Sequence, residues 1–492
     1  MLIDETEPLL AHVDVNKHQD HTTDRSLIDF NPNGDLDNPM EWSKAYKLGI
    51  ISLLSLMAFT VSFTCIGVVP VADRIVRDLS GREDKTSSIM LVTVWELGEA
   101  AGPLLMAPLS EIYGRYPVFN VANIVFIFGV VLAALSQTTG LFIFSRFLTG
   151  FATASNVLGP AIIGDIFPSE KRGSGMSLIT FAPLIGGTVG PAIGGAIAET
   201  FGWRKILWMS AILAIICEIF FFTLLRETYK VSILQRRAAR LRKETNDESL
   251  KCVFEAENGG SALWWSVLRT SISRPVVVMI NSFVLQIMSF YGGLAFALYY
   301  IMATSLPGIL REIYGFSPAL TGSAFISFSG GAVCGIVVCN LFLDRVYIAL
   351  GKSNGGTQPE YRLPFMIGAA AILPVVVALY GWAPSAQWPV YLLLLTVGLV
   401  GFVLITISIP LSSYVVDAFG LYSASAMTMV LLVRCLAGTL LPLAIPPLTD
   451  AVGLGYGFLL LAGFCLVMFP LPIVVMRYGS SWRQKSVYTR ND

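Results

Sequence analysis

The sequence predicts an all-α polytopic membrane protein with twelve transmembrane helices in two six-helix halves. Of its 492 residues, 54% are hydrophobic and 13% are charged, about half the charged fraction of a soluble domain. Apolar stretches recur from Leu48 to Met476, and each is long enough to cross a hydrocarbon core about 30 Å thick. A polar segment from Arg226 to Arg274 separates the stretches into two equal sets.

Charged residues, prolines and glycines bound the apolar stretches and define the individual spans. The twelve spans are expected at residues 48–72, 87–110, 117–136, 141–166, 173–198, 204–225, 275–303, 316–343, 363–382, 387–411, 422–446 and 453–476. The predicted domains are an N-terminal tail without stable structure (1–47), a six-helix bundle (48–225), a central loop (226–274), a second six-helix bundle (275–476) and a C-terminal tail (477–492).

The distribution of basic residues predicts which side each loop faces. The two tails and the loops after even-numbered spans hold 24 of the 33 Lys and Arg residues, whereas the remaining loops hold 7. Because basic loops stay on the cytoplasmic side, both tails and the central loop are expected in the cytoplasm. The plasma membrane is the expected location, with the vacuolar or peroxisomal membrane as alternatives, and we expect a monomer in the lipid bilayer.

Charged side chains inside the spans need a reason to be there, since a charge near the bilayer centre costs at least ~2.5 kcal/mol. Glu96 and Glu99 are three residues apart and share a helix face. Burial favours the protonated carboxyl, so both are candidates for proton coupling. Alternatively, they pair with a buried arginine such as Arg146 and lock two helices together. Arg146 and Arg434 would then neutralise a carboxylate or hold an anionic substrate.

The sequence lacks the patterns that other energy sources and activities require. It offers no nucleophile with its base, and Gly351-Lys352-Ser353 lacks the first glycine of a phosphate-binding loop, because Val346 occupies that position. Six of the seven cysteines lie in apolar segments without metal-ligand spacing. We therefore expect no enzyme activity, no metal, no cofactor and no nucleic-acid partner, and we expect a proton gradient as the energy source.

Three motifs together resemble a known family. The stretch from Ala107 to Pro117 resembles G-x-L-x-D-x-x-G-R-[KR], with alanine for the first glycine, Glu111 for the aspartate and Tyr116 for the last basic residue. The stretch from Arg146 to Gly150 resembles R-x-x-x-G, and residues 186–195 match G-x-x-x-G-P-x-x-G-G in full. Residues 35–478 thus resemble the major facilitator superfamily, in its fungal twelve-span drug:proton antiporter branch.

This resemblance implies the major facilitator fold and alternating access, with a small organic compound (drug, toxin or secondary metabolite) exported by proton antiport. It implies Glu99 and Arg146 as the coupling pair. It also implies a cytoplasmic gating motif and an antiporter motif. The gating residues would be Glu111, Gly114, Arg115, Asp165, Asp344 and Arg345, and the antiporter residues would be Gly186, Gly190, Pro191, Gly194 and Gly195.

Substrate and direction stay open at this stage. Uptake or organellar transport of a nutrient or metabolic precursor by the same fold is an alternative, and a receptor-like or enzymatic membrane protein is another. Span 7 carries aromatic and polar side chains that could line a substrate cavity or could equally face lipid and neighbouring helices. The cavity candidates are Phe283, Gln286, Phe290, Tyr291, Tyr299 and, in span 11, Arg434.

Overall fold

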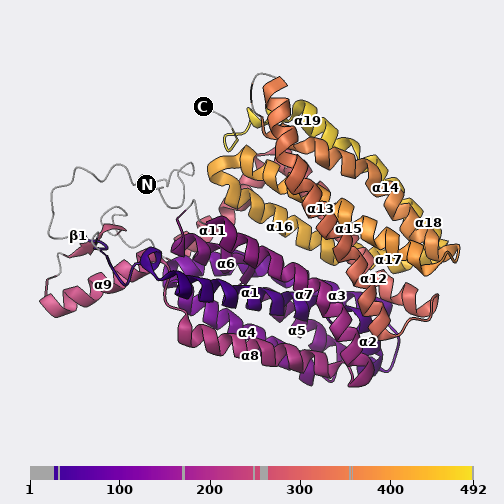
Figure 1. Cartoon of the computed structure of the whole chain (residues 1–492), viewed down its shortest axis with the longest axis horizontal. Helices are drawn as coiled ribbons and strands as arrows, with labels where there is room; N and C mark the ends of the chain where they lie inside the picture. The colour runs from indigo at the N-terminus through magenta and orange to yellow at the C-terminus, as the bar shows by residue number, and fades with distance from the viewer. Residues whose placement is uncertain are drawn as a thin grey trace.

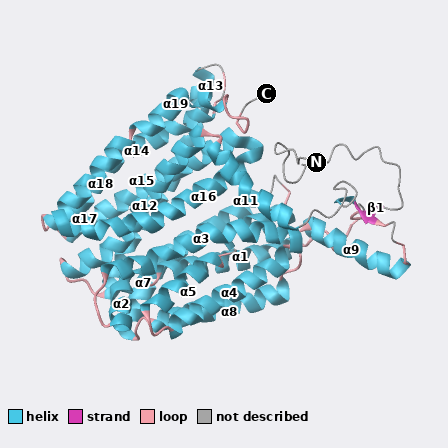
Figure 2. Cartoon of the chain, turned by 180° about the vertical axis from the view of Figure 1, so that it is seen from behind, coloured by secondary structure: helices cyan, strands magenta, loops and turns pink. Residues whose placement is uncertain are grey.

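The computed structural model describes residues 27–31, 34–153, 155–168, 172–247, 250–254, 264–353, 356 and 358–489. These residues form helices almost throughout, which confirms the all-α prediction. The helices lie in two bundles, one from each half of the sequence (Figure 1). Figures 1 and 2 show that the bundles meet near α2, α12 and α17 and diverge toward α9 and the N-terminal segment.

The first bundle contains α1 (Lys44–Ile66), η3 (Val69–Val71), α2 (Ala72–Ser80), α3 (Lys85–Tyr113), α4 (Arg115–Leu135), α5 (Thr139–Phe151), α6 (Ser155–Ile166), α7 (Arg172–Thr200) and α8 (Arg204–Leu224). The second contains α12 (Phe283–Glu312), α13 (Pro318–Ser353), η5 (Pro359–Arg362), α14 (Leu363–Ser385), α15 (Val390–Phe419), η6 (Gly420–Tyr422), α16 (Ser423–Leu440), η7 (Leu441–Ala444), α17 (Ile445–Val452), α18 (Leu454–Met468) and α19 (Pro470–Arg483). Outside the bundles lie β1 (Leu27–Ile28), η2 (Pro39–Glu41), α9 (Lys230–Thr245), β2 (Lys251–Cys252) and α11 (Trp264–Ile280).

Eleven helical segments of the described chain are long and apolar enough to cross a membrane. The fourth predicted span, residues 141–166, is instead divided between α5 and α6, which are both shorter. The seventh was predicted to begin at residue 275. In the structure, α12 begins later, at Phe283, because the Ser282 side chain accepts a hydrogen bond from the Leu285 amide and caps a new helix. Residue 275 lies instead within α11.

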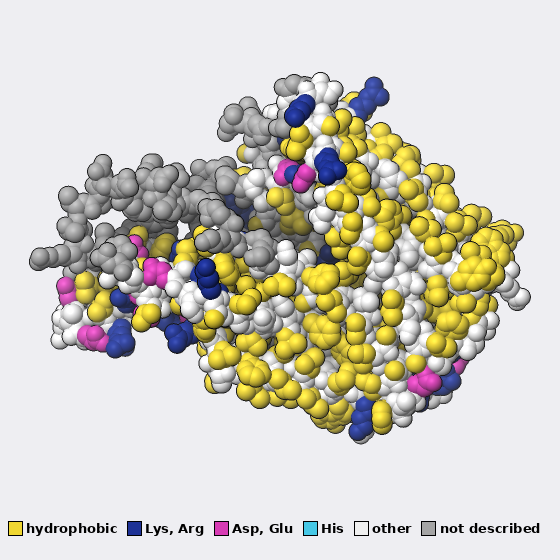
Figure 3. Space-filling view, in the orientation of Figure 1, with side chains coloured by type: hydrophobic (Ala, Val, Ile, Leu, Met, Phe, Trp, Pro, Cys, Tyr) yellow, Lys and Arg dark blue, Asp and Glu magenta, His cyan; other side chains and the backbone are white. Residues whose placement is uncertain are grey.

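Figure 3 shows hydrophobic side chains over the sides of both bundles, while charged side chains gather near the helix ends. Large apolar residues of several helices are more than half exposed, among them Val121, Phe128, Phe222, Val375 and Leu395. In water such a surface would drive aggregation. The chain is therefore a multi-pass membrane protein whose outer faces contact lipid.

The N-terminal segment packs against the part of the chain that connects the first bundle to the second. β1 pairs in parallel with β2, and Ile28 and Phe30 pack against the buried side chains of Leu234, Ala238 and Cys252. We call the described residues within 27–43 and 226–254 the tail–loop module. Its described part differs from the predicted tail without stable structure, since the partners that order it lie some two hundred residues away along the chain.

An ion pair holds this module together at its centre. The Arg237 Nη1 donates to Asp35 Oδ2 at 2.6 Å, and the Asp35 side chain is 8% exposed. This hydrogen bond holds the pKa of the Asp35 carboxyl below its usual value of 3.8. Because the pKa is lower when the segment is docked, the stabilisation is fully present above pH 3.8 and is lost as the pH falls through the docked value.

Arg237→Glu is expected to release the N-terminal segment, since it places a carboxylate against Asp35. The measurement is hydrogen exchange of the backbone amides in residues 34–43, which should speed up. The charge-swapped Asp35→Arg/Arg237→Glu variant should restore slow exchange, and Arg240→Glu, whose parent side chain pairs with Glu244 at the surface, should stay like the wild type. Equal exchange in the single and swapped variants would show that the pair does not hold the segment.

Candidate functional site

The two glutamates of α3 lie where the bundles meet. Glu96 is 3% exposed, and its Oε1 accepts a hydrogen bond of 2.5 Å from the Tyr300 hydroxyl of α12. Glu99 is one helical turn farther along α3 and is partly exposed. The Arg434 guanidinium of α16 lies within electrostatic range of both carboxyls. Two carboxyls of the first bundle thus face a hydroxyl and a cation of the second.

Arg146 lies deep in the first bundle, but its hydrogen bonds go to the backbone. Its guanidinium donates to the carbonyl oxygens of Leu91 (3.2 Å), Thr64 (2.9 Å) and Cys65 (2.5 Å) and stacks on the Trp95 ring at 4.6 Å. These contacts tie α5 to α1 and α3. The carboxyls of Glu96 and Glu99 instead interact electrostatically with Arg434. Because backbone carbonyl oxygens occupy the Arg146 guanidinium, Arg434 is favoured over Arg146 as their charge partner.

Several buried polar atoms at this contact have no hydrogen-bond partner within the described chain. They are Glu96 Oε2, Thr93 Oγ1 and Arg434 Nε. The Thr93 carbonyl oxygen meanwhile accepts a hydrogen bond from Thr439 of α16 at 3.2 Å. A buried polar atom without a partner is costly, so the site is suited to take up a proton or a ligand group.

Only part of the predicted substrate cavity lies at this contact. Tyr299 is partly exposed, and its ring lies 4.9 Å from that of Phe328 on α13. Arg434 lies 4.4 Å from the Phe296 ring centroid. Phe296, Tyr299 and Phe328 thus form an aromatic wall beside Arg434. Sequence reasoning missed Phe296, Phe328 and Tyr300, since their positions depend on how α12 and α13 are rotated.

The other predicted cavity residues lie elsewhere. Phe283 packs edge-on against Trp482 of α19 at 5.0 Å, and the Gln286 amide donates to two carbonyl oxygens at the end of α11, both at 3.1 Å. Phe290 is 50% exposed and Tyr291 is 2% exposed. Phe283 and Gln286 thus join α12 to α11 and α19.

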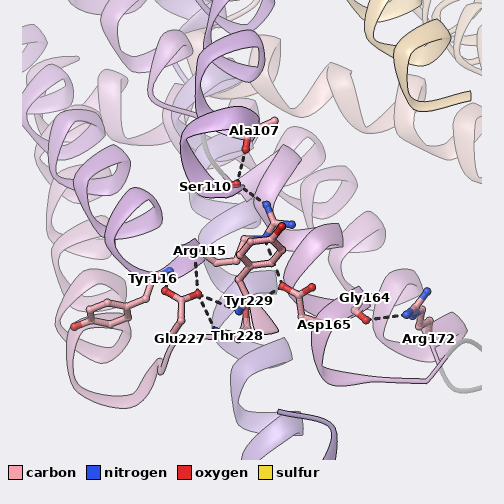
Figure 4. Close-up of polar contacts among 10 residues, drawn as sticks. All are labelled: Ala107, Ser110, Arg115, Tyr116, Gly164, Asp165, Arg172, Glu227, Thr228 and Tyr229. Atoms are coloured by element: carbon pink, nitrogen blue, oxygen red, sulfur yellow. Dashed lines mark hydrogen bonds and ion pairs between the residues drawn. The ribbon is translucent and has the colours of Figure 1, made fainter. Parts of the chain in front are cut away.

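Figure 4 shows Arg115 and Asp165, two of the predicted gating residues of the first bundle, with their polar contacts. Arg115 Nε lies 3.4 Å from Asp165 Oδ2, its Nη1 donates to the Ser110 hydroxyl at 2.5 Å, and its guanidinium stacks on Tyr229 at 4.8 Å. Glu111 is within electrostatic range of Arg115. The structure thus brings Arg115 and Asp165 together at the ends of α4 and α6.

A residue that sequence reasoning missed organises this cluster. The Glu227 carboxylate accepts hydrogen bonds from the Arg115 amide at 2.8 Å and the Tyr116 amide at 3.4 Å (Figure 4). It therefore caps the start of α4, where backbone donors lack partners. Gly114 has φ +99°, and a Cβ there would collide with this carboxylate. Nearby, burial raises the pKa of Tyr229 to about 12.

The second bundle has a comparable cluster at the same end. Arg362 lies 2.9 Å from Asp344 and 2.5 Å from Asp417. It is thus Arg362, which the sequence prediction did not include, that pairs with Asp344. The predicted Arg345 lies 5.9 Å from the Phe342 ring. A buried pair joins Glu360 to Arg483 at the end of α19, with distances of 2.8 and 3.0 Å.

The predicted antiporter motif of α7 has two contact faces. Gly186, Gly190 and Gly194 approach α1 and the turn after it: a Cβ on Gly186 would lie 2.5 Å from the Phe59 carbonyl oxygen. A Cβ on Gly195 would instead collide with the Pro318 carbonyl oxygen of α13. In return, a Cβ on Gly322 of α13 would collide with the Pro191 carbonyl oxygen. One face of the motif therefore packs within its bundle and the other packs across the two bundles.

The bundles are closed at the end opposite α9. Lys85 pairs with Asp450 at 2.7 Å and Arg311 pairs with Asp73 at 3.3 Å, each across the bundles. A small cavity of about 170 Å³ lies between them. Toward the α9 end the bundles diverge, and the surface is recessed between them (Figure 3). The contact that holds Glu96 thus belongs to two bundles that are joined by ion pairs at one end and diverge toward the other.

Comparisons with known proteins agree with this architecture. Residues 51–442 match the family described as Major Facilitator Superfamily. The chain is 33% identical over 465 residues to "Efflux pump radE" of Floropilus chiversii, covering 94% of this chain and 85% of the relative. It is 32% identical over 457 residues to "MFS transporter cpaT" of Aspergillus oryzae, covering 92% and 90%.

Solved structures show the same fold. The chain superposes with a TM-score of 0.63 on the xylose transporter XylE from E. coli in a partially occluded inward open conformation, at 15% identity, covering 88% of this chain and 98% of that one. The family match, the fold and the relatives matched over most of their length all indicate the same family. The chain belongs to the Major Facilitator Superfamily of membrane transporters and is not an enzyme.

Proposed function

We propose that this transporter exports a small, partly hydrophobic organic compound in exchange for protons. The observation that carries the proposal is the carboxyl pair of buried Glu96 and partly exposed Glu99 at the contact between the bundles, held against Tyr300 and Arg434 of the other bundle. A carboxyl at that place can take up a proton on one side and release it on the other as the bundles rock.

The basic central segment supports a cytoplasmic location for the α9 end of the molecule, because basic loops stay on that side. The recessed surface between the diverging bundles then faces the cytoplasm, and the Lys85–Asp450 and Arg311–Asp73 pairs seal the outer face. Cargo enters from the cytoplasm and meets the aromatic wall of Phe296, Tyr299 and Phe328. Rocking about the α7–α13 contact breaks the outer seal and releases the cargo outside.

The gating residues support the ends of the helices during this motion. Glu111, Arg115, Asp165 and Glu227 all belong to the first bundle or the segment that follows it. In the conformation described, they therefore fix the cytoplasmic ends of α3, α4 and α6 to one another. Asp344, Arg362 and Asp417 do the same for α13 and α15. Each bundle then moves as a rigid body.

Export is favoured over uptake by the complete antiporter motif and by the similarity to a protein named as an efflux pump. The plasma membrane is the proposed location, with a vacuolar or peroxisomal membrane as alternatives, and a monomer holds a complete site.

The test uses the purified full-length protein in sealed inside-out vesicles with an acidic interior. A panel of fluorescent amphipathic aromatic compounds is added outside. Proton antiport predicts that at least one compound accumulates in the vesicles above its external concentration, and that a protonophore abolishes the accumulation. Accumulation of a nutrient-like probe only in right-side-out vesicles with an acidic exterior would instead establish proton-driven uptake.

A further inference from the structure

We propose that Tyr300 is a positioning residue that makes the protonation of Glu96 depend on which way the transporter faces. The inference rests on the proposed proton antiport and adds to it the group that gives the proton cycle its direction. Tyr300 belongs to α12 and Glu96 to α3, so their hydrogen bond of 2.5 Å joins the two bundles.

The Tyr300 ring is held firmly in place by its own bundle. It is 2% exposed, and it packs against the rings of Tyr299 and Phe296 at centroid distances of 5.1 and 5.4 Å. The hydroxyl also lies 4.0 Å from the Cys65 sulfur of α1. Because the ring follows α12, the hydroxyl reaches Glu96 only while the bundles are arranged as they are here.

Other ionisable groups surround Glu96, and some belong to the first bundle while the others belong to the second. Those on the first bundle stay with Glu96 when the bundles rock, whereas those on the second move away together. The first set contains Glu99 of α3, Cys65 of α1 and Arg146 of α5, and the second contains Tyr299 and Tyr300 of α12 and Arg434 and Cys435 of α16. Within the second set, Tyr300 donates the short hydrogen bond to the carboxylate.

The direction of the effect follows from which form of the carboxyl each arrangement stabilises. A donated hydrogen bond stabilises the ionised carboxylate, so the conformation that opens to the cytoplasm favours release of the proton. When the outer face opens, α12 withdraws its donor and Glu96 takes a proton from the acidic exterior. Protons then move inward while cargo moves outward, as antiport requires.

Tyr300→Phe removes only the hydroxyl. The titration of Glu96 is followed by pH-dependent infrared difference spectroscopy of the full-length protein in phosphatidylcholine nanodiscs, with Glu96→Gln identifying the carboxyl band. A hydrogen bond to a charged group is worth enough to move the midpoint by about one to two pH units. We expect the Tyr300→Phe midpoint to lie higher by that amount, and gradient-driven accumulation to be lost at neutral cytoplasmic pH and regained at higher pH.

Two further variants distinguish a positioning role of Tyr300 from a general disturbance of the structure. Tyr380→Phe removes a buried hydroxyl that bonds Ser305 within the second bundle, and its Glu96 titration should match the wild type. Tyr300→Phe/Glu96→Gln should behave like Glu96→Gln alone, because Tyr300 acts through that carboxyl. An unshifted Glu96 midpoint in Tyr300→Phe, or a shifted midpoint with unchanged driven transport, would overturn the inference. If the wild type itself shows no gradient-driven transport, the proposed function fails instead.

Discussion

Glu96→Gln is expected to lose gradient-driven export of every compound that the wild type accumulates, with a fall in driven rate of about 100-fold, the scale for loss of a positioned proton-transfer group. Glutamine keeps the shape of the side chain and still accepts a hydrogen bond from Tyr300, so the contact between the bundles survives. It cannot bind and release a proton, so the proton gradient can no longer drive the cycle.

The matched control is another membrane glutamate. Glu218 on α8 accepts a hydrogen bond of 2.8 Å from Asn123 inside the first bundle and is 9% exposed. Glu218→Gln should transport like the wild type, because this carboxyl is remote from the contact between the bundles. If Glu96→Gln still accumulates cargo while Glu99→Gln does not, Glu99 is the coupling carboxyl and Glu96 has a structural role.

Gly195→Val is expected to stop transport while the protein still inserts into the membrane. The added Cβ collides with the Pro318 carbonyl oxygen. This oxygen belongs to the backbone and cannot move away by a change of side-chain rotamer. Overpacking of this kind costs about 1–3 kcal/mol. That cost falls on the conformation sealed at the outer face, so its population relative to the opposite conformation should drop by about 5- to 150-fold.

Gly187→Val is the control on the same helix, since a Cβ at Gly187 meets no atom within 4 Å. Gly322→Val, on the facing helix, should reproduce the defect of Gly195→Val because its Cβ collides with the Pro191 carbonyl oxygen. The measurements are vesicle transport and the labelling of single cysteines from each side of the membrane. Equal transport by the Gly195 and Gly187 variants would show that the α7–α13 contact does not govern rocking.

Much of the fold could be predicted from the sequence because a membrane span depends on local composition alone. Apolar stretches identify the spans whatever their neighbours are, and Glu96 and Glu99 stand out because charge is expensive in that setting. The predicted start of the seventh span was wrong because α11 ends in an equally apolar run, so composition alone does not show where α12 begins. Only the cap at Ser282 separates the two helices, and a single serine gives a weak signal.

The pairings within the site depend on tertiary structure and were therefore harder to predict from the sequence. Arg115 and Asp165 could be paired through the family resemblance, whereas Glu227 is 112 residues from the Arg115 amide that it binds. Tyr300 is 204 residues from Glu96. Neither has an unusual sequence context, since a glutamate after a span and a tyrosine within one are ordinary. Arg434 was recognised as a deep charge, but its place opposite Glu96 and Glu99 required the packing of α16 on α3.

Proton movement driven by cargo tests the central claim most directly. Inside-out vesicles containing the wild-type protein and a trapped pH-sensitive dye, with no imposed pH gradient, receive the panel compound that gave the largest driven flux. Antiport predicts that entry of this compound pushes protons out, so the interior becomes more alkaline, and that Glu96→Gln abolishes the change. Entry of the compound without proton movement, or with acidification of the interior, would contradict proton antiport.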